Sequence, residues 1–130
     1  MSMDMISEYR ATMFDGEADI GWLRQGWRGL RQYGRRARAA VEAGDIATKA
    51  AMIARADELL NLMSGILDTG DDTSLGPALM TIYSALRFTL LRANTENTPE
   101  ASLAALNDFE AALAYLDRDM IKISESVLAA

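Results

Sequence analysis

The sequence predicts an all-α protein, an antiparallel up-down four-helix bundle with a flexible N-terminal arm and a long C-terminal helix. In four long segments, apolar residues recur at steps of three and four positions, which places them on one face of a helix. The connections between these segments are short and polar, so consecutive helices must alternate in direction. With 130 residues, half of them apolar, the chain has the size and composition of one globular domain. We expect residues 1–17 to form the arm and residues 18–130 the bundle domain.

The residue types present exclude several classes of function. The chain has no cysteine, which excludes disulfides, thiolate metal sites and cysteine catalysis. It also has no histidine, on which most general-base chemistry and most metal sites of helical bundles depend. We therefore expect no enzyme activity, no cofactor and no metal site.

Charge and hydropathy patterning predict a cytoplasmic location. No apolar run approaches the roughly 18 residues of a membrane span, so we expect no membrane insertion. Asp4 and Glu8 stand where a signal peptide would have an apolar region. The net charge of −6 opposes attraction to nucleic acid, which we do not expect as a partner.

The arm, residues 1–17, mixes apolar and polar residues without a sustained period. Its apolar side chains, Tyr9 among them, could lie in a groove of the bundle. A frayed chain terminus is the equally simple alternative.

The first helix is expected over residues 19–43, with Asp19 as N-cap and Gly44 as the left-handed residue that ends it. Three glycines inside this helix are unfavourable for helix formation, which predicts close approach of another backbone. The core stripe comprises Ile20, Leu23, Trp27, Leu30, Ala37 and Val41, and the glycines are Gly26, Gly29 and Gly34.

The opposite face of the first helix carries a row of arginines, with no acid between Asp19 and Glu42. One interpretation is a solvated face that pairs with the acidic helices. The other is a binding surface for an anionic partner. The row comprises Arg24, Arg28, Arg31, Arg35 and Arg38, with Arg36 beside it.

The second helix is expected from its N-cap, Asp45, to about Leu67, and no proline interrupts it. One line of apolar residues follows its core face, and a second group broadens that line. The line is Ile46, Ala50, Ile53, Leu60 and Leu67, and the second group is Met52, Leu59, Leu62, Met63 and Ile66.

The next segment, Asp68-Thr69-Gly70, is similar to the active-site segment of retroviral-type aspartic proteases. That chemistry needs paired aspartates held by β-hairpins, whereas the flanks here have the period of a helix. A calcium loop would need an acidic residue where Leu79 stands. We therefore expect a polar connection, with Ser74 as the next N-cap and Pro77 in the first helical turn.

The third helix, residues 75–94, is apolar over more than the roughly 100° that a surface helix needs. Such a helix is either central in the bundle or leaves part of its apolar surface for a partner. One apolar line is Leu75, Leu79, Ile82, Leu86 and Ala93, and the rest is Met80, Tyr83, Phe88, Leu90 and Leu91.

The fourth helix begins after Thr98 as N-cap, with Pro99 at the first helical position. We expect it to reach about Leu128, which is roughly 45 Å of helix, so its end should overhang the other helices. It has the most regular pattern in the chain, formed by Leu106, Phe109, Leu113, Leu116, Met120, Ile123 and Val127.

Several motifs in these helices, at their mutual spacing, resemble one known family. Residues 40–46 have the form of an Ala-Ile-Glu-x-Gly-Asp turn, and Leu67-Asp68 resembles the Leu-Asp pair that ends the next helix. Tyr83 and Ala93-Asn94 fit the pattern Leu-Tyr…Leu-x-x-Ala-Asn. From about residue 20 to 118, the chain is similar to the flagellin secretion chaperones of the FliS family.

The resemblance implies a cytosolic chaperone that binds the C-terminal segment of flagellin, prevents premature polymerisation and hands flagellin to an export-gate component. The wide apolar surfaces of the helices agree with this function, because a disordered amphipathic segment could fold into a groove between helices. The flexible thioether of methionine suits such a surface. We predict as partner-binding residues Tyr9, Trp22, Tyr33, Met63, Met80, Tyr83, Leu91 and Asn94, and we assign Trp27 to the core.

Two alternatives from other classes stay open. A structural or regulatory homodimer would pair two bundles through the overhanging end of the fourth helix, and its mass would depend on concentration. A polyanion binder would use the arginine row of the first helix, and its affinity would collapse as salt rises.

Overall fold

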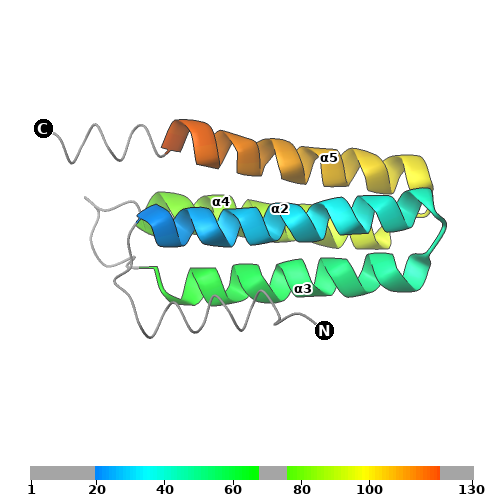
Figure 1. The fold of residues 1–130 in the computed structure, drawn as a ribbon, viewed down its shortest axis with the longest axis horizontal. Coiled ribbons are helices and arrows are strands. Elements are labelled where there is room, and N and C mark those ends of the chain that lie inside the picture. Colours follow the sequence, from blue (N-terminus) through cyan, green and yellow to red (C-terminus); the bar gives the residue numbers. More distant parts are fainter. Residues whose placement is uncertain (1–19, 68–75, 121–130) are drawn as a thin grey trace, which may run out of the picture.

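The computed structural model describes residues 20–67 and 76–120, which form four α-helices and a π-helical turn (Figure 1). The elements are α2 (Ile20–Glu42), α3 (Ile46–Gly65), α4 (Gly76–Thr95), α5 (Pro99–Tyr115) and η1 (Leu116–Met120). The predicted fold class, an antiparallel up-down four-helix bundle, is confirmed. Several predictions lie outside the described residues, namely those on the arm with Tyr9, the Asp19 cap, the connection from Asp68 to Ser74, and the helix beyond Met120.

Each helix occupies one corner of the bundle. α2 packs against α3 and α5, and α4 packs against the same two helices. α2 therefore lies diagonally opposite α4. The seam between α2 and α5 is consequently on the opposite side of the bundle from the seam between α3 and α4.

The turn between α2 and α3 is fixed by Gly44 and Asp45, as their sequence predicts. Gly44 has a φ of +73°, and its N–H donates to the carbonyl of Val41 at 3.1 Å. The N–H of Asp45 donates to the carbonyl of Ala40 at 2.8 Å, which completes a Schellman motif. The carboxylate of Asp45 then accepts from the backbone N–H of Thr48 at 3.1 Å and from its hydroxyl at 2.6 Å. These hydrogen bonds lower the pKa of Asp45, because they stabilise its charged form.

The junction between α4 and α5 is equally well defined. The hydroxyl of Thr98 accepts from the backbone N–H of Ala101 at 3.2 Å, which confirms the predicted N-cap, and Pro99 takes the first turn. The buried hydroxyl of Ser102 donates to the carbonyl of Ala93 at 3.0 Å and so joins the two helices. The chain is thus held in a fixed register where it reverses direction.

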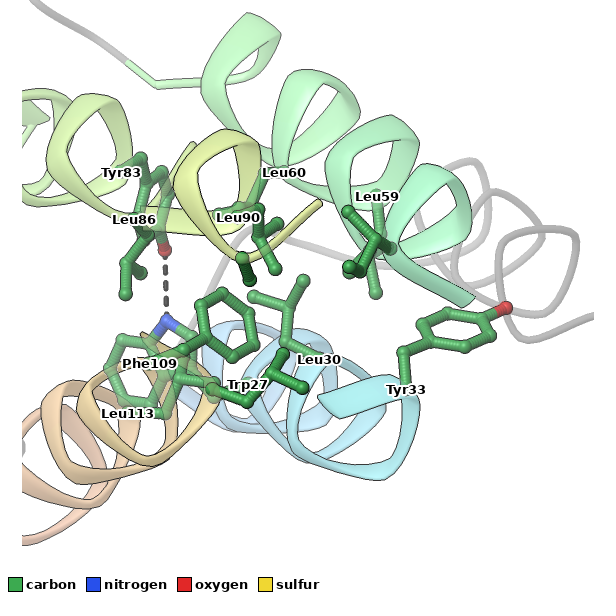
Figure 2. Close-up of a cluster of buried hydrophobic side chains, with 14 of the residues drawn as sticks. Trp27, Leu30, Tyr33, Leu59, Leu60, Tyr83, Leu86, Leu90, Phe109 and Leu113 are labelled. Atoms are coloured by element: carbon green, nitrogen blue, oxygen red, sulfur yellow. Dashed lines mark hydrogen bonds between the residues drawn. The ribbon is translucent and has the colours of Figure 1, made fainter. Parts of the chain in front are cut away.

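The core contains aromatic side chains from three helices (Figure 2). Trp27 of α2, Tyr83 of α4 and Phe109 of α5 are almost completely buried, in the company of leucines from all four helices. The indole Nε1–H of Trp27 donates to the hydroxyl of Tyr83 at 2.9 Å, across the diagonal of the bundle. Burial raises the pKa of Tyr83 to about 12, although the hydrogen bond from Trp27 acts in the opposite direction.

Two details of the predicted packing are wrong. Ile46, placed in the core from its period, is 75% exposed because it opens α3 at the end of the bundle, next to the turn from α2. Gly34, expected to admit another backbone, instead admits an aromatic ring. A Cβ at this position would lie 3.3 Å from Cδ2 of Phe109.

Candidate functional site

An open groove of about 560 Å³ lies between α3 and α4. Its lining combines apolar and polar side chains. α3 contributes Ala50, Ile53, Ala54 and Asp57, and α4 contributes Ser84, Arg87, Phe88, Leu90, Leu91 and Asn94.

The groove stays open because the two helices contribute side chains of unequal size. On α3, Ala50 and Ala54 stand one turn apart and are too short to fill the space beside α4. On α4, Phe88 is 70% exposed and Leu91 is 58% exposed, although both are large apolar side chains. Removing apolar surface from water is favourable by about 25 cal/mol per Å². The exposed apolar side chains of this groove therefore favour the binding of an apolar ligand.

Charged and polar groups mark the ends of the groove along α4. Arg87 binds Asp57 through two contacts, with Nε 2.8 Å from Oδ1 and Nη2 3.2 Å from Oδ2. This pairing raises the pKa of Arg87 and ties α4 to α3. Asn94, two helical turns further on, is exposed, and its side chain has no hydrogen-bond partner within residues 20–67 and 76–120. Its amide is therefore available to a ligand that lies along Phe88 and Leu91.

The predicted partner-binding residues do not form one surface in this structure. Leu91 and Asn94 line the groove together, and Met80 is half-buried outside it. Four others are buried within the bundle, with exposed fractions between 0 and 6%; they are Trp22, Tyr33, Met63 and Tyr83. The role of these residues in binding a partner stays a prediction, but among those that the structure describes, the exposed ones are Leu91 and Asn94 on α4.

Tyr83 shows why a prediction from the apolar arc of α4 can place a buried residue on the surface. A tyrosine beside the core stripe has an apolar ring and a polar tip, and either environment suits it. Here the hydroxyl finds its partner inside, on Trp27, so the ring packs in the core. A rule based on period alone cannot detect a hydrogen bond between residues that are 56 positions apart.

Sequence reasoning missed Phe88 and the two groove alanines as site residues. Phe88 lies off the apolar line of its helix, and that departure from the core stripe is the available signal for a large exposed side chain. Ala50 and Ala54 belong to a run rich in alanine. Small residues at four-residue spacing lie on one face of a helix and leave space beside a facing helix. Neither signal identifies a groove until the facing helix is known.

Most of the arginine row is engaged by acids of α5 and η1. Arg24 Nε lies 2.9 Å from Asp117 Oδ1, and Arg35 Nε lies 3.2 Å from Glu110 Oε1. Arg38 Nη1 lies 2.6 Å from the other oxygen of Glu110. For these three arginines, the interpretation of a face paired with an acidic helix describes what the structure contains. Arg28 and Arg31, the remaining members of the row, have no such contact in the described chain.

The part of the chain that the structure describes contains neither a cluster of candidate metal ligands nor a helix that could span a membrane. Residues 20–67 and 76–120 contain no group of three or more acidic side chains placed to hold a metal ion. Among the helices that these residues form, none is long and apolar enough to cross a bilayer.

The fold and the groove together define a small helical-bundle protein with a surface suited to an amphipathic ligand. A family model described as "Flagellar protein FliS" matches residues 23–114, which include both helices of the groove. The chain therefore belongs to the FliS flagellar protein family, and the predicted resemblance is confirmed. This family consists of non-enzymatic chaperones, in agreement with the prediction that the protein is not an enzyme. Comparison with curated proteins and with solved structures gives no match.

Proposed function

We propose that the protein is a cytosolic export chaperone that binds the C-terminal segment of flagellin in the groove between α3 and α4. In this proposal, the bound chaperone prevents premature polymerisation and delivers flagellin to an export-gate component of the flagellar type III apparatus. Membership of the FliS family supports the flagellin partner. The observation that carries the proposed site is the exposure of Phe88 and Leu91 beside an alanine-lined helix.

The chemistry of the groove favours a peptide that folds as it binds. An amphipathic helix presents apolar side chains at positions i, i+3, i+4 and i+7, and these anchors can lie along one groove. The step from Phe88 to Leu91 is three residues, so the two side chains offer contacts about one helical turn apart. Asn94 can hydrogen-bond to an end of the peptide that has no helical partner of its own. A segment that is disordered before it binds would gain both burial and helical hydrogen bonds.

The proposal is tested by titrating the purified protein with the flagellin C-terminal peptide while heat and far-ultraviolet circular dichroism are recorded. We expect micromolar or tighter binding and a gain of helix. Phe88→Ala should weaken binding by about 1–3 kcal/mol, which is roughly five- to 150-fold, because the ring would lose its burial by the ligand. Phe88→Ala should leave the stability of the free protein nearly unchanged, since the ring is already 70% exposed.

Matched controls lie outside the groove. Tyr115, 46% exposed on α5, is the aromatic control for Phe88, and Ile46, 75% exposed, is the aliphatic control for Leu91. Tyr115→Ala and Ile46→Ala should bind the peptide like the unaltered protein. Binding without a gain of helix would contradict the folding-on-binding mechanism. An absence of binding at micromolar concentrations would contradict the proposed chaperone function itself.

A further inference from the structure

Along the seam between α2 and α5, the two acids that bind arginines of α2 are separated by a stretch without acids. Glu110 and Asp117, seven residues apart, bind Arg35, Arg38 and Arg24. The six residues that separate these two acids, 111–116, carry no charge. The arginines in the middle of the row therefore lie along an uncharged stretch of α5.

Arg28 and Arg31 are the two unmatched arginines of this seam. Neither forms an ion pair or a hydrogen bond in the described part of the chain. Arg28 is exposed, and the Nε–H of Arg31 is buried without an acceptor. A buried guanidinium N–H that lacks an acceptor is unfavourable. These two arginines thus form a local excess of positive charge on a protein whose total charge is −6.

We propose that Arg28 and Arg31 form a docking surface for an acidic, helix-forming segment of a partner protein. The two arginines are three residues apart, about 4.5 Å along the helix axis, which matches carboxylates at positions i and i+3 or i+4 of a ligand helix. The α2 row already binds a carboxylate-bearing helix in this manner, because α5 supplies Glu110 and Asp117 along it. The exposed guanidinium of Arg28 also matches a carboxylate in geometry, since two parallel hydrogen bonds can form.

A protein segment fits this surface better than a nucleic acid or a membrane. Only two arginines are unmatched here, and the acidic total opposes the approach of a large polyanion. A short segment with two or three carboxylates would meet the local positive charge with less repulsion from the rest of the molecule. The seam lies on the side of the bundle opposite the groove between α3 and α4, so both surfaces can be occupied together. Docking at this seam therefore does not depend on the proposed flagellin binding.

The test uses the full chain and an alanine-based helical peptide of about 15 residues that carries glutamates at three- and four-residue spacing. The same peptide with glutamine at those positions is the uncharged comparison. The test variant Arg28→Gln/Arg31→Gln removes two positive charges from the seam. The control variant Arg36→Gln/Lys49→Gln also removes two positive charges, with Arg36 about 140° around α2 from Arg31 and Lys49 on α3.

We expect the glutamate peptide to bind at low ionic strength and the glutamine peptide not to bind. The test variant should weaken binding by about tenfold and keep the melting temperature, whereas the control variant should bind like the unaltered protein. Binding should persist when the groove is filled with the flagellin peptide. Equal weakening in the two variants would overturn the proposal, since it would indicate a response to total charge. Tighter binding of polyphosphate, DNA or anionic vesicles through the same two arginines would also overturn it, in favour of a polyanion ligand.

Discussion

Replacing Tyr83 by phenylalanine isolates the hydrogen bond between Trp27 and Tyr83 in the core of the bundle. The change removes only the hydroxyl that accepts from Nε1 of Trp27 at 2.9 Å, and it keeps the ring in the core. The indole N–H would then be buried without an acceptor. Such a group costs about 1–3 kcal/mol, so the free energy of unfolding at neutral pH should fall by that amount. This is a large share of the roughly 5–15 kcal/mol that stabilises a domain of this kind.

The same substitution has a pH dependence whose sign follows from the raised pKa. In the folded protein Tyr83 has a pKa of about 12, against 10.0 for an unperturbed tyrosine. Above pH 10 the unfolded chain loses this proton while the folded protein keeps it, so stability is lost as pH rises toward 12. The loss is on the order of 3 kcal/mol, because each pKa unit corresponds to roughly 1.4 kcal/mol. The phenylalanine variant has no such proton, so the stability difference between the two proteins should shrink to near zero by pH 12.

The assay is urea unfolding of both proteins at several pH values between 7 and 12, followed by circular dichroism. Other titrating groups are common to both proteins and cancel in the difference. Tyr115→Phe makes the same chemical change at a 46% exposed site and should change stability by less than about 0.5 kcal/mol. A Tyr83→Phe variant as stable as the unaltered protein at pH 7 would refute the role of the hydrogen bond. A difference that stays constant from pH 7 to 12 would refute the burial argument.

Three further predictions concern the core, the seam between α3 and α4, and the turn between α2 and α3. Gly34→Val should destabilise the bundle by about 1–3 kcal/mol in thermal unfolding, because even a Cβ at this position would lie 3.3 Å from the ring of Phe109. A variant more stable than the unaltered protein would contradict this packing. Arg87→Gln should cost no more than about 1 kcal/mol in urea unfolding, since the Arg87 and Asp57 side chains are both 42% exposed. A loss above about 3 kcal/mol would instead be the behaviour of a buried pair. The pKa of Asp45, measured by nuclear magnetic resonance, should lie below 3.8, so its cap stabilises the fold above that pH and is lost on acidification. Thr48→Val should raise that pKa, and an unchanged value would contradict the role of its hydroxyl.

The sequence predicts the fold well where local rules and burial agree. The apolar stripe of α5, extended by one residue of η1, shows this agreement. Its members are all buried as their spacing requires, and they are Leu106, Phe109, Leu113 and Leu116. The caps at Asp45 and Thr98 also follow from residue chemistry that acts within three positions. Such features need no knowledge of the other helices.

The site is predicted less well because it depends on what faces each side chain. Leu91 and Tyr83 both belong to the wide apolar surface predicted for α4, but they lie about 80° apart around the helix. Tyr83 is buried and Leu91 is 58% exposed. Neighbours on other helices decide which position faces the core, since Trp27 receives Tyr83 while α3 offers small alanines along the groove beside Leu91. Likewise, the charges of the arginine row could be counted from the sequence. Which of them meet Glu110 or Asp117 depends on the register of two helices that are far apart along the chain.

The most direct test of the central claim is site-specific photo-crosslinking from the groove. A photoreactive residue is placed at position 88 in one variant and at position 115 in another, and each is irradiated with the flagellin C-terminal peptide. Phe88 lines the groove between α3 and α4, whereas Tyr115 is exposed on α5, away from it. We predict a crosslinked product from position 88 and none from position 115. A peptide that binds but crosslinks only from position 115, or equally from both, would contradict the assignment of the groove as the binding site.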